Sequence, residues 1–136
     1  GPGFCAGKDV HVVVETMRGH NLGRLIYQGH ALPNTGVPGN IKGYSKERVI
    51  HSPCAGVCHN VKKITDIVDK GEIIAVYASM SGLLRGLIQD GYNVTSGFKM
   101  ADIDPRVDEY QNCFTISDKA RCIGGGVLEA ILHGLS

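Results

Sequence analysis

The stretch "SPCAGVCHNVKKITDIVDKGEIIAV", residues 52–76, decides the fold because the chain repeats its pattern. A shift of 26 residues, from 52 to 78, lays it without a gap over "ASMSGLLRGLIQDGYNVTSGFKMAD", residues 78–102. The positions that agree are Gly56 with Gly82, Val57 with Leu83, Val61 with Leu87, Val68 with Val94, Gly71 with Gly97 and Ala75 with Ala101. Agreement at two glycines and at the apolar positions between them indicates an internal repeat.

Each copy is predicted to be a small β unit. Its first strand leads to a turn, at Thr65-Asp66 in the first copy and at Gly91-Tyr92 in the second. A second short strand follows, then a turn at Lys70-Gly71 or Ser96-Gly97, and then a closing strand. One such unit cannot bury an apolar face, whereas two can bury their inner faces against each other. We therefore expect a mainly β lobe over residues 47–104.

The segments before this lobe predict further β structure and a linker. The apolar run from Lys8 to Thr16 and the stretch "LGRLIYQG", residues 22–29, each predict a strand, so residues 1–30 are expected to form a β segment. Residues 31–46 are too rich in glycine, proline and asparagine for regular structure. They are expected to form a loop or linker.

Residues 105–136 are expected to form a linker and a C-terminal helix. Ser117 is the predicted N-cap, and apolar residues follow at helical spacing up to a stop at Gly134. Gly124, Gly125 and Gly126 would each cost about 1 kcal/mol inside the helix relative to alanine. Either the helix begins after these glycines, or their bare surface packs closely against another element.

Composition excludes several classes of protein. The 14 basic and 13 acidic residues are interspersed and give a net charge of +1, which does not support nucleic-acid binding. No segment approaches the ~18 apolar residues needed to cross a membrane. Five cysteines are an odd number and no signal peptide precedes them, so we expect reduced thiols and a cytoplasmic protein. The abrupt start on a glycine-rich loop suggests a fragment of a longer chain.

The repeated half-unit resembles that of lipoyl and biotinyl carrier domains, in which a Gly-Val strand leads to two further turns. The resemblance implies a barrel-sandwich hybrid fold for residues 47–104, with repeats at 52–76 and 78–102. Those carriers present a modified lysine at the junction of their halves. The junction here, "AVYASMSG" at residues 75–82, contains no lysine, so no attachment site for biotin or lipoate is seen. A hairpin loop missing near residues 75–77 would leave that question open.

A second resemblance covers the whole chain and is more specific. "GPGFCAGKDVHVVVETMRGHNLGRLI", "PNTGVPGNIKGY", "GLLRGLIQDGYNVTSGFKMADIDPR" and "TISDKARCIGGGVLEAIL" together are similar to the C-terminal half of YqeB-type accessory proteins of selenium-dependent molybdenum hydroxylases. The resemblance implies a maturation factor for enzymes related to xanthine dehydrogenase. It implies that the partner is the apo-enzyme. It also implies that a molybdopterin-type cofactor or a selenium species is bound as a ligand and is not used as the protein's own cofactor.

The same resemblance implies an α/β half that precedes this chain in the family. Residues 1–30 and the C-terminal helix are then expected to complete that absent domain or to form a contact in a homo-oligomer. Whether any reaction is catalysed stays open. The alternatives to a maturation role are a biotinyl or lipoyl carrier and a purely structural interaction module.

The densest polar cluster surrounds "RGHNLGR", residues 18–24. It combines the side chains of Asp9, His11, Glu15, Arg18, His20 and Arg24. Two arginines and two histidines suit an anion such as a phosphate, a pterin phosphate or a selenium oxyanion. Gly1 and Gly3 precede the cluster in a loop that lets backbone approach a ligand. The alternative is a solvated turn with structural ion pairs.

The motif "CAGVCH", residues 54–59, invites a metal or redox interpretation. Structural zinc usually takes two close pairs of ligands, and only one pair is present, so we predict no metal site. Cys54 overlays Met80 and Cys58 overlays Leu84, which favours cysteines that fill apolar positions. Cys54, at the strand entry, and Cys5, in the glycine-rich loop, are the candidate reactive thiols.

Overall fold

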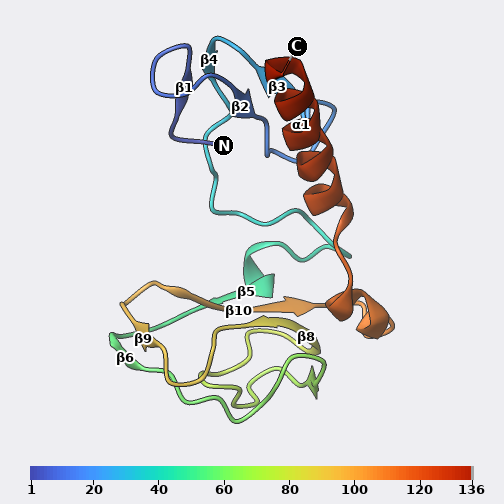
Figure 1. Ribbon diagram of the computed structural model, residues 1–136. Helices are drawn as coiled ribbons and strands as arrows, with labels where there is room; N and C mark the ends of the chain where they lie inside the picture. The colour runs from blue at the N-terminus through green and yellow to red at the C-terminus, as the bar shows by residue number, and fades with distance from the viewer. Residues whose placement is uncertain (136) are drawn as a thin grey trace. The chain divides into compact units, whose positions relative to one another are not determined.

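The computed structural model describes residues 1–135 as two compact units. One unit comprises residues 1–36 together with the stretch from Ile116 onward, and the other runs from Val37 to Thr115. Figure 1 shows the helix α1 (Asp118–Gly134) in the first unit and the longest strands in the second. The chain is mainly β with one C-terminal α-helix, as expected from the sequence.

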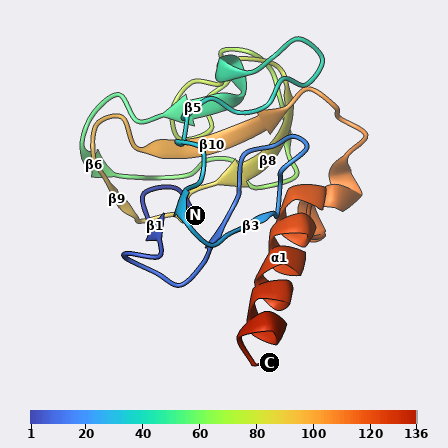
Figure 2. The same ribbon diagram turned by 90° about the horizontal axis from the view of Figure 1, so that it is seen from above.

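The second unit is built on a four-stranded antiparallel sheet. Its order is β5 (Val49–His51), β10 (Lys99–Asp104), β8 (Gly82–Leu87) and β7 (Ile67–Val68). Figure 2 shows β5, β10 and β8 following one another in this order. A separate two-stranded sheet pairs β6 (Gly56–Val57) with β9 (Asn93–Val94). Among residues 1–135 the strands form several small sheets and no closed barrel, so the carrier-like barrel-sandwich hybrid stays a proposal.

Hydrogen bonds of the two repeats match under the same shift of 26 residues. Gly56 pairs with Val94 as Gly82 pairs with Val68, so each repeat contributes a strand to the other. The amide of Cys58 donates to Tyr92 O at 2.9 Å, and the amide of Leu84 donates to Asp66 O at 2.8 Å.

The hydrogen bonds at the junction of the repeats match those between the segments around β5 and β10, at the two ends of the lobe. The amide of Ala78 donates to Glu72 O at 2.8 Å, as the amide of Ser52 donates to Phe98 O. The bridge between Ile73 and Tyr77 corresponds to the pair Lys99 and His51. The junction is therefore a tight hairpin in the position where β5 and β10 pair.

The turns of the repeats also correspond. Thr65 and Gly91 have φ of 88° and 78°, and Gly71 and Gly97 have φ of 86° and 78°. These are left-handed conformations, which glycine adopts without steric cost. Thr65 adopts one although it is not glycine, and its amide donates to Leu84 O at 2.8 Å, as the amide of Gly91 donates to Cys58 O.

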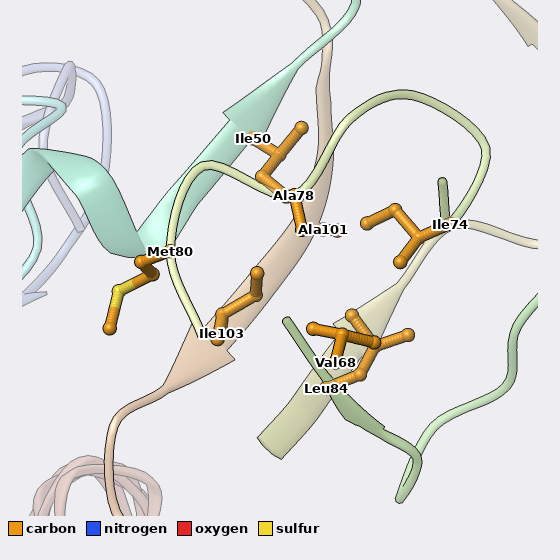
Figure 3. Packing of buried hydrophobic residues seen from close by; sticks show 8 residues of the cluster. All are labelled: Ile50, Val68, Ile74, Ala78, Met80, Leu84, Ala101 and Ile103. Atoms are coloured by element: carbon orange, nitrogen blue, oxygen red, sulfur yellow. The ribbon is translucent and has the colours of Figure 1, made fainter. Parts of the chain in front are cut away.

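The core of this unit joins the two repeats. Its main cluster comprises Ile50, Val68, Ile74, Ala78, Met80, Leu84, Ala101 and Ile103. Figure 3 shows these side chains gathered between the strands. Cys58, Val94 and Met100 form a second cluster. Val68 and Val94, which match in the repeat, thus belong to different clusters, each made of residues from both copies.

A buried arginine ties the segment 37–48 to β10. Arg48, in the short 3-10 helix η1 (Lys46–Arg48), is 7% exposed. Its guanidinium donates to Gly39 O at 3.1 Å and to Ile103 O at 3.3 Å. It also lies 3.4 Å from the carboxylate of Asp102. Two backbone carbonyls and one carboxylate together satisfy a charge that would be costly to bury alone.

The first unit has two short antiparallel pairs. β1 (Cys5–Ala6) pairs with β4 (Gly29–His30), and β2 (Val13–Val14) pairs with β3 (Leu25–Ile26). The predicted strands over residues 8–16 and 22–29 are therefore mostly not strand. One reason is that the amides of residues 8–10 turn back to Cys5 O, so that the first part of the apolar run lies in a turn. Ala6, Val13 and Ala31 form the small core.

The helix α1 confirms the predicted cap. The side chain of Ser117 accepts a hydrogen bond from the amide of Ala120 at 3.2 Å, and Asp118 lies in the first turn. The three glycines lie inside the helix. Gly126 packs so closely on the loop before β3 that an added Cβ would lie 2.2 Å from Gly23 O, whereas Gly124 and Gly125 have open space. The expectation of close packing is thus met by one glycine of the three.

The apolar residues of α1 point away from that contact. At 100° per residue, the apolar side chains of the last turns centre on the side opposite Gly126. They are Val127, Leu128, Ile131 and Leu132, together with Leu135, which directly follows the helix. Their exposed fractions run from 44% to 80%. The helix is therefore packed on one side, by Gly126, and presents an apolar face on the other.

Candidate functional site

The predicted anion-binding residues lie in the first unit, mostly in the loop between β2 and β3. The amide of Glu15 donates to Arg24 O at 2.9 Å, and the amide of Gly23 donates to Glu15 O at 2.8 Å. These bonds continue the β2–β3 pairing by one step and close the loop 16–22. The structure therefore brings Glu15, Arg18, His20 and Arg24 onto one loop.

The Glu15 carboxylate is buried, at 4% exposure, and serves the backbone. One oxygen accepts from the amide of Met17 at 2.7 Å and the other from the amide of Leu32 at 2.9 Å. Burial alone would raise the pKa of Glu15, but these backbone hydrogen bonds lower it below its ordinary value. One oxygen thus holds the loop itself through Met17, and the other joins it to the segment after β4 through Leu32.

Arg18 faces the helix. Its two terminal nitrogens bind the Asp118 carboxylate at 2.5 and 2.9 Å, with side chains that are 53% and 70% exposed. This hydrogen bond raises the pKa of Arg18 and lowers that of Asp118. The pair is bidentate, so an anion that binds Arg18 must compete with Asp118 or approach beside it.

The remaining members of the cluster are exposed and less constrained. Arg24 donates to the side chain of Asn21 at 3.1 Å, and His11 and His20 are exposed without side-chain partners among residues 1–135. Asp9 lies in the preceding turn, where its carboxylate accepts from the amide of Cys5 at 2.9 Å. Arg24 and His20 are the members with the most capacity to bind a further group.

The glycines at the start of the chain lie in an exposed turn. Gly3 has a φ of 93°, and no heavy atom lies within 4 Å of an added Cβ there. An added Cβ on Gly1 would lie 3.9 Å from Thr16 Cγ2, which places the first residue next to the loop that carries Arg18.

The candidate thiols differ in exposure. Cys54 is exposed and Cys5 is partly buried, and all five cysteines are free. Cys58 is 3% exposed, and burial followed by the nearby charge of Asp90 raises the pKa of its thiol. Cys58 thus fills an apolar position as Leu84 does, whereas Cys54 does not share the burial of Met80, which is 4% exposed.

One charged cluster was not predicted. Asp104 is fully buried at the end of β10, and its carboxylate accepts from Arg85 at 2.7 Å and from Arg106 at 2.7 and 3.0 Å. Burial would raise the pKa of Asp104, but hydrogen bonds from Arg106 and Arg85 hold it well below its usual range. The sequence "DIDPR" offers the local Arg106, but no spacing rule connects Asp104 to Arg85, 19 residues away.

The junction of the repeats carries no lysine to which biotin or lipoate could be attached. Its tight hairpin exposes Tyr77, which is 70% exposed, and residues 75–82 contain no lysine. Within residues 1–135, no three His, Cys, Asp or Glu side chains are close enough together to hold a metal ion. In the same range, no helix is both long and apolar enough to cross a membrane.

Comparison with known proteins gives one clear relative. The Escherichia coli (strain K12) protein named "Uncharacterized protein YqeB" is 52% identical to this chain over an alignment of 138 residues. The alignment takes in 97% of this chain. The chain matches part of YqeB. The match takes in 25% of the length of YqeB, so this chain spans about a quarter of that relative. No family model and no solved structure match the chain.

Because the YqeB match covers nearly the whole chain, it spans both units. The residues of the β2–β3 loop offer groups that can bind a ligand. The guanidinium groups and exposed histidines suit anions, and the loop that carries them is fixed from within by Glu15.

Proposed function

We propose that this chain is part of an accessory protein for the maturation of selenium-dependent molybdenum hydroxylases, and that it acts by binding. The observation that carries the proposal is the YqeB match over 97% of the chain, together with the resemblance of the same motifs to YqeB-type accessory proteins. The apo-enzyme is the proposed partner. The cofactor or selenium precursor is the proposed ligand, and the cytoplasm is the proposed location.

The proposed ligand site is the loop 16–24 with its arginines and histidines. Arg24 and His20 are exposed there, and Arg18 is half-exposed beside Asp118. A selenium oxyanion or a pterin phosphate presents several acceptor oxygens, which match guanidinium and imidazole donors. The apolar face of α1 supports the further proposal that the first unit completes a larger domain in the intact protein.

A carrier of the biotinyl or lipoyl kind is the second candidate function. The matching hydrogen bonds of the two repeats favour the barrel-sandwich hybrid fold on which it rests. The absence of lysine from residues 75–82 argues against covalent attachment at the junction. Intact-mass measurement of the full-length protein separates the two, because an adduct of biotin or lipoate would refute the maturation proposal.

The ligand proposal is tested with selenite and the intact protein by calorimetry. Arg24→Gln with His20→Gln should weaken selenite binding about tenfold or more, because charge-assisted hydrogen bonds each contribute about 1.5–3 kcal/mol. Arg121→Gln is the matched control, since Arg121 is exposed on α1 in the same unit. Equal binding by the double variant and the control would show that the loop does not hold the anion.

A further inference from the structure

The strands β6 and β8 are equivalent in the repeat but have different surroundings. β8 lies between β10 and β7, whereas among residues 1–135 only β9 lies beside β6. The pairing of β6 with β9 corresponds, residue for residue, to the pairing of β8 with β7. In the part of the chain that the structure describes, the position next to β6 that corresponds to β10 is therefore without a strand.

Exposure of the equivalent residues shows the same difference. Leu83 is 1% exposed, and its counterpart Val57 is 53% exposed. An added Cβ on Gly82 would lie 2.4 Å from Asp104 O, because β10 crosses directly over that glycine. An added Cβ on Gly56 has no heavy atom within 4 Å. His59, whose counterpart Arg85 lies in β8, has no hydrogen-bond partner among residues 1–135.

The short junction explains why the position is empty. Ile103 and Asp104, which cover β8, correspond under the shift of 26 residues to Tyr77 and Ala78 at the junction of the repeats. Those two residues are used in the junction hairpin, where Tyr77 bridges Ile73 and the amide of Ala78 donates to Glu72 O. The chain turns back before it can run along β6.

Gly56 itself points to an occupant. Its φ is not in the left-handed region and no neighbour approaches it, so nothing within this structure requires glycine there. A glycine in a strand is destabilising by about 0.5–1 kcal/mol relative to alanine. Gly82 must be glycine because the backbone of β10 leaves no room for a Cβ there. A strand lying over Gly56 would exclude a Cβ in the same way and would explain why that residue is glycine.

We propose that the open edge of β6 binds an extended peptide segment of a partner protein, which adds as an antiparallel strand in the position that β10 occupies beside β8. The register of β10 defines the ligand. A β-branched apolar residue would lie opposite Cys58, as Ile103 lies opposite Leu84, and a backbone carbonyl would lie over Gly56. The inference rests on strand geometry and does not depend on the maturation role.

The probe is a synthetic peptide with the sequence of β10 and its flanks, FKMADIDPR, added to the intact protein. Deuterium exchange followed by mass spectrometry should show uptake in residues 54–61 slowed several-fold as peptide is added. Gly56→Val should abolish this slowing without altering exchange elsewhere, because the added side chain has room in the free protein but meets the docked backbone. Gly125→Ala, at another open glycine, should respond like the wild type.

Three results would overturn the proposal. Peptide that leaves uptake in residues 54–61 unchanged would show that the edge does not add a strand. An equal response from Gly56→Val would place the peptide elsewhere. Slow exchange of the same residues without peptide, or slowing that follows protein concentration, would show that the edge is already covered by the intact chain or by a second copy.

Discussion

At the scale of single residues, the buried carboxylates of this chain hold backbone and arginine in place. Asp104 fixes the end of β10 by binding Arg85 from β8 and Arg106 from the following turn. Glu15 joins the β2–β3 loop to Leu32. In both cases the charge is satisfied by several donors, which is the condition under which a buried carboxylate is tolerated.

Asp104→Asn tests the contribution of this cluster to stability. Removing one partner of a buried ion pair costs about 3 kcal/mol, and we expect a loss of that order in the free energy of unfolding near neutral pH. The folded pKa of Asp104 is lowered, so its contribution is complete above about pH 4 and is lost as the pH falls through the folded pKa. The variant should therefore lose less stability than the wild type on acidification.

Urea unfolding of both proteins at a series of pH values provides the measurement. Asp108→Asn is a suitable control, because Asp108 is an exposed carboxylate close to Arg106 in sequence. Parallel pH curves for wild type and Asp104→Asn would contradict the assignment.

Single residues also show how far sequence could predict the site. The burial of Cys58 followed from its match to Leu84, because a repeat transfers environment from one copy to the other. The exposure of Cys54 did not follow, since its counterpart Met80 is covered by packing that the first copy lacks. The sequence could not predict that Glu15 accepts hydrogen bonds from backbone amides. That role depends on Leu32 lying beside Glu15, and hydrophobic periodicity does not predict such a contact.

At the scale of elements, α1 was predicted well because its signals are local. Ser117, Asp118 and the apolar spacing act within a few residues of one another. The strands of the first unit were predicted too long, because the turn at residues 7–10 is closed by the carbonyl of Cys5 rather than by a pattern in the apolar run. Tertiary contacts set those boundaries.

The three glycines of α1 give an internally controlled prediction. Gly124→Ala and Gly125→Ala should each stabilise the protein by about 0.5–1 kcal/mol, because both have open space and alanine favours the helix. Gly126→Ala should destabilise it, because the new Cβ would lie 2.2 Å from Gly23 O. Thermal unfolding of the three variants provides the comparison, and stabilisation by Gly126→Ala would show that α1 does not pack on Gly23.

At the scale of the whole molecule, the two units have unequal cores. The second unit buries eight residues in its main cluster, and the first buries three in its own. Small cores with little buried apolar surface open more readily than large ones. The described residues of the apolar face of α1 do not belong to the buried cluster of the first unit.

We therefore expect the first unit to open before the second in the 136-residue chain. Native-state hydrogen exchange at increasing urea should show residues 13–31 and 118–134 losing protection while β8 and β10 remain protected. A single transition common to α1 and β10 would mean that the two units unfold together.

The repeat was the strongest guide to the whole fold, and it has a limit. It predicted the positions of the turns at residues 65, 71, 91 and 97, all of which have positive φ. The repeat could not predict how the two copies pair. The same sequence pattern is expected whether each copy pairs its own strands or the two copies exchange strands. It also could not show that β6 and β8 differ in their neighbours, which depends on the length of the junction.

The exchange of strands between the repeats has a consequence for synthesis. β6 finds its partner in β9 and β7 finds its partner in β8, so the first repeat contains no strand pair of its own apart from the junction hairpin. In a nascent chain that has emerged only as far as residue 76, β6 and β7 therefore lack their partner strands and can pair only after β8 and β9 leave the ribosome. We therefore expect the valines and isoleucines of the first repeat to stay exposed to solvent during that interval.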